Sequence, residues 1–194
     1  MTQIEPVTLI GTHVILRPLT PDDAPALRAA VAEGALHTKW STTIPAPDHV
    51  EADIAHRLAK QAAGDWLAFS QVAPDGTMLG QTTYLNIDRN VPRLEIGNTF
   101  LRPAAQRTPI NTEAKRLLLA HAFDTLGMAA VDFRTHRLNS HSRRAIERLG
   151  AQLDGILRNH KRMPDGTLRD TATYSILASE WDTIRAHLDH QLAC

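Results

Sequence analysis

A predicted strand that turns directly into a helix constrains the fold of this 194-residue chain more than any other feature. Residues 94–101, Leu-Glu-Ile-Gly-Asn-Thr-Phe-Leu, have the composition of a strand with one acidic residue, Glu95. After a short turn at 102–109, apolar residues spaced i, i+3, i+4 and i+7 predict an amphipathic helix; they are Leu119, Ala122, Phe123 and Leu126. The first turn of such a helix has unpaired backbone N–H groups and favours an anion, so this junction predicts a phosphate site in an α/β fold.

The rest of the chain supplies further strands and helices, and we expect one α/β domain over residues 1–194. Predicted strands lie at 13–19, 66–72, 78–87, 94–101, 128–135, 153–158 and 171–177. Predicted helices start at Pro21 after a Thr20 N-cap, at Asp48 with capping-box spacing to Glu51, near residue 110, at Ser140, and at Ser179–Asp182. In the last helix Trp181, Ile184 and Leu188 share one face.

Composition excludes several classes of protein. The 21 Lys and Arg balance 21 Asp and Glu, which argues against a general nucleic-acid binder. No apolar run approaches the length of a membrane span, and Met1–Pro6 lacks the features of a signal peptide. We therefore expect a cytoplasmic protein that binds neither nucleic acid nor a membrane.

Cysteine and histidine patterns do not predict a metal site. The single cysteine, Cys194, excludes an internal disulfide and a cysteine-based metal cluster. Among ten histidines, His136 and His141 are five residues apart and no His-Glu-x-x-His or His-x-His motif occurs. We expect no metal.

Six segments, in order, resemble the GNAT acetyltransferases, in particular the RimJ/RimL-like branch. The most specific is the segment 131–158, which contains Asn139-x-x-Ser142 followed by Ile146, Leu149-Gly150-Ala151, Asp154-Gly155 and Arg158. The other segments are ILRPLTPDDAPAL (15–27), LEIGNTFL (94–101), NTEAKRLLLAHAFDTLG (111–127), DGTLRDTATYSIL (165–177) and Glu180-Trp181. The resemblance implies a mixed, largely antiparallel sheet, flanked by helices and splayed between its fourth and fifth strands, here residues 94–101 and 128–135.

The family uses acetyl-CoA as donor, so the resemblance implies a cofactor site along this junction. It assigns cofactor contacts to Phe100, Leu101, Gln106, Arg107, Thr108, Ile110, Asn111 and Thr112. The family loop reads Arg/Gln-x-x-Gly-x-Gly/Ala, and Gln106 matches its start, but Pro109 and Asn111 replace the glycines. We expect Thr108 to cap the helix and Pro109 to be its first residue, which removes one N–H while leaving those of the next three residues. The alternative is a capped helix that no longer binds CoA.

Glu95 corresponds to the carboxylate with which several GNAT enzymes deprotonate the amine, often through water. Only a neutral amine attacks a thioester, and burial in an apolar strand would raise the pKa of Glu95, which suits a base. The alternative is a structural carboxylate paired with Arg93 or Arg102.

The resemblance places Asn139 on the pantetheine amide and gives Ser142 a contact with CoA or the protonation of the leaving thiolate. The alternative for both is helix capping. The basic segment 134–148 also carries Arg143 and Arg144, either of which would meet the 3′-phosphate or adenine, although a solvated helix face explains many of its arginines. Two histidines of this segment, His136 and His141, would add positive charge below about pH 6.5. Tyr174 fits a core residue better than an acid.

We therefore expect an acetyl-CoA-dependent N-acetyltransferase with Glu95 and Ser142 as catalytic residues. Its amine acceptor, a peptide N-terminus or a small molecule, would contact residues 34–49. The amine would attack the thioester directly in a ternary complex, without a covalent enzyme intermediate. Two alternatives remain open: a degenerate binding module that has lost acetyl-CoA, and an enzyme that uses another acyl-CoA. The family often forms homodimers.

Overall fold

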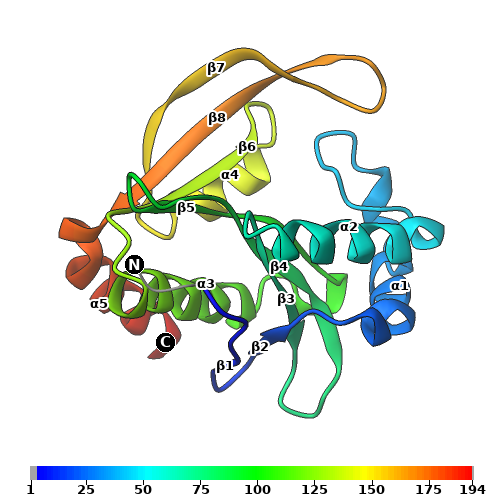
Figure 1. Ribbon diagram of the computed structural model, residues 1–194, viewed down its shortest axis with the longest axis horizontal. Helices are drawn as coiled ribbons and strands as arrows, with labels where there is room; N and C mark the ends of the chain where they lie inside the picture. The colour runs from blue at the N-terminus through cyan, green and yellow to red at the C-terminus, as the bar shows by residue number, and fades with distance from the viewer. Residues whose placement is uncertain (1–3, 194) are drawn as a thin grey trace.

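The eight strands found within residues 4–193 join one mixed sheet in the order β1-β2-β3-β4-β5-β6-β8-β7 (Figure 1). The protein is described by a computed structural model over residues 4–193, so the expectations for Met1–Gln3 and Cys194 lie outside the described residues. The strands are β1 (Leu9–Ile10), β2 (Ile15–Pro18), β3 (Leu67–Val72), β4 (Met78–Asp88), β5 (Arg93–Leu101), β6 (Ala130–His136), β7 (Gln152–Arg162) and β8 (Leu168–Leu177).

Strands β5 and β6 form the one parallel pair of this sheet, and they part early. Their register runs only from Arg93 opposite Ala130 to Glu95 opposite Asp132. Beyond Glu95, β5 continues beside β4, whereas β6 continues beside β8. This divergence confirms the predicted splay between the strands at 94–101 and 128–135.

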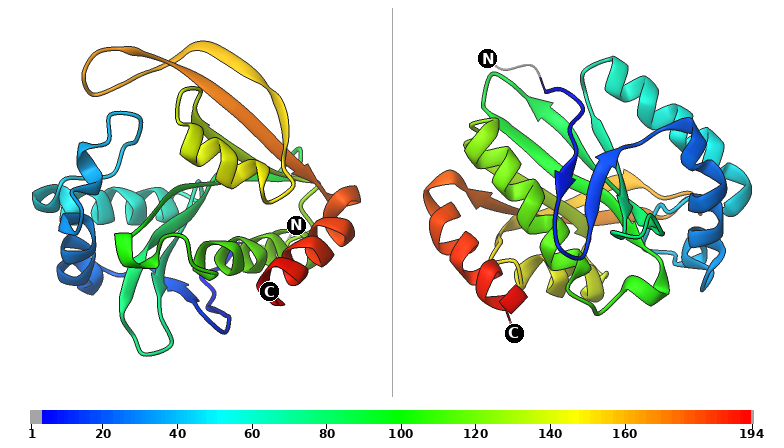
Figure 2. Two further views of the ribbon diagram at one scale, coloured as in Figure 1. Left: turned by 180° about the vertical axis from the view of Figure 1, so that it is seen from behind. Right: turned by 90° about the horizontal axis from the view of Figure 1, so that it is seen from below.

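Helices cover both faces of the sheet (Figure 2). On one face α1 (Ala24–Ala32) and α2 (Val50–Ala62) pack against β3 and β4. On the other face lie α3 (Ile110–Ala120), α4 (Ser140–Glu147) and α5 (Trp181–Ala193). The predicted apolar face of α5 is confirmed, because Trp181, Ile184 and Leu188 are all buried in the core. The helices therefore enclose the sheet and leave its splayed middle to form a site.

Two predicted helix starts differ in detail. A short helical turn at 21–23 precedes α1, and buried Asp23 accepts hydrogen bonds from Thr20 N (3.0 Å) and Ser70 Oγ (2.7 Å). The predicted capping box between Asp48 and Glu51 does not form, because Glu51 pairs with Arg28 on α1. Tertiary ion pairing thus overrides the local capping pattern.

The β7–β8 hairpin is longer than predicted. Both strands extend about the turn at 163–167, where the sequence predicted strands only at 153–158 and 171–177. Most of β7 is exposed, so its residues do not alternate between apolar and polar types, and that alternation is the basis for predicting a half-buried strand. In Figure 1 this hairpin projects beyond the rest of the sheet.

No helix within residues 4–193 is both long and apolar enough to cross a membrane. Within the same range, no three or more His, Cys, Asp or Glu side chains are grouped so as to hold a metal ion.

Candidate active site

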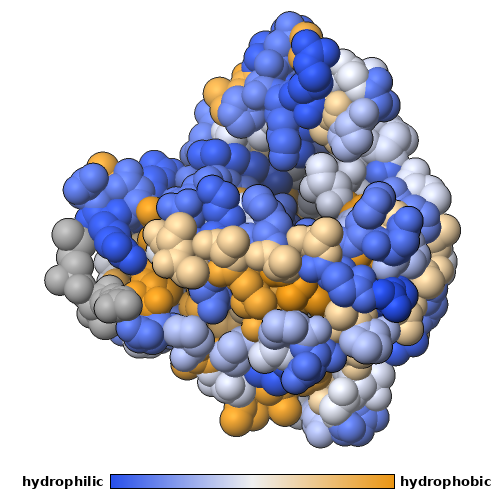
Figure 3. Space-filling view, turned by 45° about the vertical axis from the view of Figure 1, so that its right-hand side comes forward, coloured by the Kyte–Doolittle hydropathy of each residue, from blue (hydrophilic) through white to orange (hydrophobic). Residues whose placement is uncertain are grey.

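The splay between β5 and β6 opens a cleft of about 800 Å³. Its walls come from the segment 36–45, the second half of β5, the start of α3, and α4, with Arg169 of β8 at its margin. Figure 3 shows the surface hollowed beneath the hydrophilic lobe that contains the β7–β8 hairpin. Strands β5 and β6, which pair only up to Glu95, therefore border this cleft on its two sides.

The lining of the cleft is cationic although the chain as a whole is neutral. Eight lysines and arginines line it: Lys39, Arg57, Arg107, Lys115, Arg134, Arg144, Arg148 and Arg169. None of the aspartates or glutamates between residues 4 and 193 belongs to this lining. Such a concentration of one sign of charge in a concave site attracts a polyanion.

The turn before α3 keeps the form of a phosphate site without its glycines. Pro109 has φ −59° and directly precedes α3, one position earlier in the helix than predicted. The hydroxyl of Thr108 donates to Ala105 O (2.8 Å) and accepts a long bond from Ile110 N (3.4 Å). The left-handed residue of this turn is Arg107, with φ +61°, so neither position that usually holds glycine needs a positive φ here. The replacement changes side-chain volume and removes one N–H, and the backbone of the turn is unstrained at both positions.

Most of the residues assigned to the cofactor line the cleft. These are Phe100, Leu101, Gln106, Arg107, Thr108, Asn111, Asn139 and Ser142. The side chain of Gln106 ties the turn back to the strand by donating to Leu101 O (2.8 Å). Three assigned residues lie outside the lining: Ile110, Thr112 and Arg143.

Arg143 does not line the cleft, and its expected contact with the cofactor stays a prediction. Its Nε donates to the hydroxyl of Tyr174 (2.7 Å), and that hydroxyl donates to Glu147 (2.7 Å). Tyr174 is only 1% exposed, so it is a core residue, as the sequence favoured. The neighbouring Arg144 lines the cleft instead.

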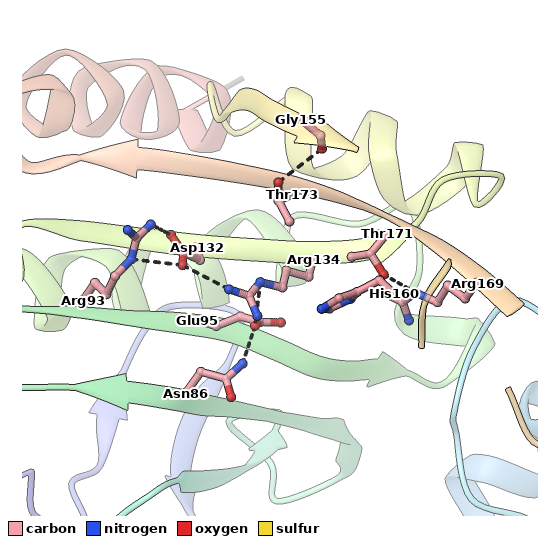
Figure 4. A network of polar contacts seen from close by, with 10 residues as sticks. All are labelled: Asn86, Arg93, Glu95, Asp132, Arg134, Gly155, His160, Arg169, Thr171 and Thr173. Carbon is pink, nitrogen blue, oxygen red and sulfur yellow. Dashed lines mark hydrogen bonds and ion pairs between the residues drawn. The ribbon is translucent and has the colours of Figure 1, made fainter. Parts of the chain in front are cut away.

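Glu95 lies at the last position of β5 that pairs with β6. It is 6% exposed and belongs to a network of polar contacts (Figure 4). Its Oε2 accepts from Asn86 Nδ2 (2.7 Å), and Arg134 Nε lies 3.5 Å away. Burial raises the pKa of this carboxyl above its ordinary value, while Arg134 and the bond from Asn86 oppose the rise. Neither Arg93 nor Arg102 is its partner, because they bind Asp132 and Glu33.

The Glu95 carboxyl approaches the cleft over a glycine. A Cβ on Gly97, which lines the cleft, would lie 3.1 Å from Glu95 Oε1. The next residue, Asn98, has φ +46°, and the register between β4 and β5 shifts there, which marks a β-bulge. Bulges of this kind re-aim a strand next to a site.

Asn139 caps α4 and at the same time borders the cleft. Its Oδ1 accepts from Ser142 N (3.0 Å). Both side chains line the cleft, so capping holds them in place at the mouth of the splay. Capping and a cofactor role are compatible here.

Sequence reasoning missed several residues of this site. Lys115 and Arg169 line the cleft, while Asn86 and Arg134 surround Glu95. Lys115 precedes Leu118 and Leu119 on the apolar face of α3, and a lysine at such a position is the one feature that could have identified it. His136 also differs from expectation: burial chiefly lowers its pKa, aided by Arg169, so it takes up a proton only at a lower pH than an ordinary histidine.

Comparisons with known proteins agree with this geometry. The model of the acetyltransferase (GNAT) domain matches residues 13–152. The chain belongs to the GNAT acetyltransferase family. It is an N-acetyltransferase whose acetyl donor is acetyl-CoA.

Solved structures share this fold over nearly the whole chain. A GCN5-related N-acetyltransferase from Brucella melitensis is 29% identical, with 98% of this chain and 87% of that chain covered and a TM-score of 0.87. RimJ of Mycobacterium smegmatis, in complex with CoA-disulfide, is 22% identical over 96% and 95% of the chains, with a TM-score of 0.82. An acetyl transferase of Salmonella typhimurium that modifies the N-terminal serine of L7/L12 is 16% identical over 88% and 99%, with a TM-score of 0.78. No curated protein sequence matches the chain significantly.

Proposed function

We propose that this GNAT enzyme, as a single domain over residues 1–194, transfers acetyl directly to the primary amine of a peptide N-terminus or a small molecule. Acetyl-CoA supplies an activated acetyl thioester. We place acetyl-CoA in the cleft because of the charge of the lining. Eight lysines and arginines and no carboxylate line the cleft, although the chain has zero net charge. CoA is a polyanion, so the donor set fits its phosphates.

The phosphates are assigned to the first turn of α3 and to the arginines beside it. The N–H groups of Ile110, Asn111 and Thr112 belong to the helix turn that has no intrahelical acceptors. Arg144 of α4 and Arg148, which follows α4 and donates to the Thr112 hydroxyl (3.3 Å), line the same cleft. Ile110 and Thr112 do not line the cleft, so the contacts proposed for them are made by their backbone N–H groups alone.

Glu95 is the proposed base. A carboxyl with a raised pKa accepts a proton from an ammonium more readily than an ordinary surface carboxylate does. Its Oε2 is engaged by Asn86, whereas Oε1 lies over Gly97 at the cleft wall and accepts the proton, directly or through one water. Asn86 acts as a positioning residue.

Asn139 and Ser142 form the proposed cofactor-facing end of α4. The amide of Asn139 has an N–H₂ group to offer the pantetheine arm while its Oδ1 caps the helix. The Ser142 hydroxyl donates a proton to the departing thiolate. Both roles rest on their place in the cleft lining.

The acceptor is proposed to enter beside the segment 36–45. This segment contributes Lys39, Trp40 and Ile44 to the lining, across the cleft from α4. The ring of Trp40 packs edge-on against His136 at 4.8 Å between centroids, which fixes this wall against β6. Lys39 and Arg169 make this end of the cleft cationic.

Calorimetric titration with CoA and acetyl-CoA tests the proposal. We expect saturable binding of both by folded protein, and thiol release when amines are added with acetyl-CoA. The absence of heat with either ligand would remove the proposed function. Binding of acetyl-CoA without acetyl transfer to any peptide or small amine would indicate a binding module. Release of the CoA thiol only with a longer acyl-CoA would indicate that this longer acyl-CoA, and not acetyl-CoA, is the donor.

A further inference from the structure

Lys115 is a buried lysine without a carboxylate partner among residues 4–193. It is 6% exposed and lines the cleft, and its Nζ donates to Thr99 Oγ1 (2.9 Å) and Thr82 Oγ1 (3.3 Å). No carboxylate among residues 4–193 lies within ion-pair distance of Nζ. Burying an unpaired ammonium is costly, so burial alone lowers the pKa of Lys115 to about 7.

The ionisable groups on the surrounding elements are engaged elsewhere. On α3, the Glu113 carboxylate accepts from the backbone N–H groups of residues 12–14. On β4, the hydroxyl of Tyr84 donates to Leu118 O (2.6 Å), and on the far face of that strand Asp53 binds Arg57 and Gln81. On β5, Glu95 is bound to Asn86, and Arg148, just after α4, donates to the Thr112 hydroxyl (3.3 Å). The described part of the chain, residues 4–193, therefore supplies no anion for Lys115.

Lys115 lies close in the fold to the turn before α3, to which the phosphates of CoA are assigned. Lys115 lies one helical turn after Asn111, on the same face of α3, and both line the cleft. Side chains on a helix lean toward its N-terminus, and the Lys115 amine reaches Thr99 near the end of β5, the strand that leads into the turn where the phosphates are assigned. That turn has lost the N–H that Pro109 cannot offer. An ammonium nearby replaces a neutral donor with a full charge.

We propose that Lys115 is a proton-linked counter-charge for the cofactor, whose amine takes up a proton from solvent when the phosphates of CoA enter the cleft. The inference rests on the proposed function, because it assumes that the phosphates bind at this turn. No bond other than N–H changes. At pH 8 the empty cleft holds Lys115 mostly as the neutral amine, and its two threonine partners accept N–H bonds in either state.

The sign of the linkage follows from the charges. A nearby anion favours the ammonium, so bound cofactor raises the pKa of Lys115. Binding then takes up protons at any pH between the lower pKa of the empty cleft and the higher pKa of the complex. Affinity falls as the pH rises through that window.

The experiment is calorimetric titration of acetyl-CoA into the folded protein at pH 8, without acceptor, in Tris and in HEPES. The difference in observed enthalpy between buffers of different ionisation enthalpy counts the protons taken up. Acetyl-CoA has no free thiol, and its phosphates are almost fully ionised at this pH, so neither obscures the count. We expect an uptake of at least half a proton per ligand in the wild type.

Two variants make the test specific to this residue. Lys115→Met should bind about tenfold more weakly with no proton uptake. Lys115→Arg, which is always charged, should bind without uptake, so a failure of the methionine variant to fold leaves the test intact. Lys60→Met, a surface lysine paired with Asp65, should retain the wild-type uptake.

Other outcomes overturn the proposal. A wild type that binds acetyl-CoA with the same heat in both buffers contradicts it and leaves the proposed function standing, whereas no binding at all contradicts the proposed function as well. Uptake that survives in Lys115→Arg but disappears in His141→Gln assigns the proton to the exposed histidine of the cleft. Equal uptake with S-acetylpantetheine, which has no phosphates, assigns the linkage to the acyl arm.

Discussion

Asn86 donates a 2.7 Å hydrogen bond to Glu95 from the neighbouring strand, and this bond orients the carboxyl that β5 places next to the cleft wall. Asn86 itself has φ +51°, at a second register shift between β4 and β5. The irregularity of β4 therefore turns an amide toward Glu95. One oxygen of the carboxyl is held, and the other lies over Gly97.

Glu95→Gln should lower kcat about 100-fold while the Kd of acetyl-CoA stays unchanged. Glutamine keeps the shape and the bond to Asn86 but cannot accept the proton. Steady-state kinetics together with calorimetry measure both quantities. Glu51→Gln, on the surface ion pair with Arg28, is the matched control and should match the wild type. Unchanged kcat in Glu95→Gln would remove Glu95 as the base.

The pH profile of kcat gives an independent test of Glu95. Burial raises the pKa of this carboxyl, and a base works only when ionised. Activity should therefore fall with decreasing pH through a pKa above the ordinary glutamate value, and this acidic limb should be absent in Glu95→Gln. An identical limb in both proteins would belong to another group.

Gly97→Ala should reduce kcat about tenfold with little loss of stability, within about 1 kcal/mol in the free energy of unfolding. The new Cβ would lie 3.1 Å from Glu95 Oε1 and from Leu85 Cδ2, so the carboxyl must shift. Gly155→Ala in β7 is the control, because its Cβ would meet nothing within 4 Å. Equal kinetics of the two variants would contradict the approach of Glu95 over Gly97.

Asn139 variants separate capping from cofactor binding. Asn139→Ser retains a side-chain oxygen for the cap, whereas Asn139→Ala removes it at about 1 kcal/mol of stability. Both lose the N–H₂ group, so both should weaken acetyl-CoA binding, and only the alanine variant should lower Tm. If the serine variant binds as tightly as the wild type, Asn139 is a capping residue alone.

Ser142→Ala should lower kcat with little effect on Tm, because the cap is accepted from the backbone N–H and not from the hydroxyl. A reduction of about tenfold is expected for the loss of a proton donor to the thiolate. Ser140→Ala, at the exposed start of the same helix, serves as the control. Wild-type kcat in Ser142→Ala would exclude the hydroxyl as that donor.

Arg144→Gln should weaken acetyl-CoA binding about tenfold and reduce the salt dependence of Kd, because it removes one cation from the cleft lining. Arg143→Gln should instead lower Tm with little change in Kd, because its guanidinium binds Tyr174. Titrations at low and high salt measure the difference. The reverse ranking would restore Arg143 as the cofactor contact.

Local patterns predicted the elements that bury one face. Side-chain spacing predicts the apolar face of α5, the strand β5 and the helix α3. In each of these elements one face contacts the core, so apolar residues recur at the spacing of that face. The length of β7 and β8 was not predictable in this way, since exposed strands need no alternation. Helix capping at Asn139 was readable from sequence, whereas the Asp48–Glu51 pattern was overridden by Arg28, a residue on another helix.

The sequence by itself determined the fold, the family and the residues at the two helix ends that border the cleft. Only the tertiary structure decided which side chains face it. Arg143 and Arg144 are adjacent arginines that the sequence does not distinguish. In the fold, Arg143 donates to the Tyr174 hydroxyl, whereas Arg144 lines the cleft. In the sequence, Lys115 is one of 21 lysines and arginines. In the fold it is buried between α3, β4 and β5, where it donates to two threonines and has no carboxylate partner among residues 4–193. Burial and pairing depend on residues distant in sequence, and for that reason the charge of the cleft emerges only in the folded chain.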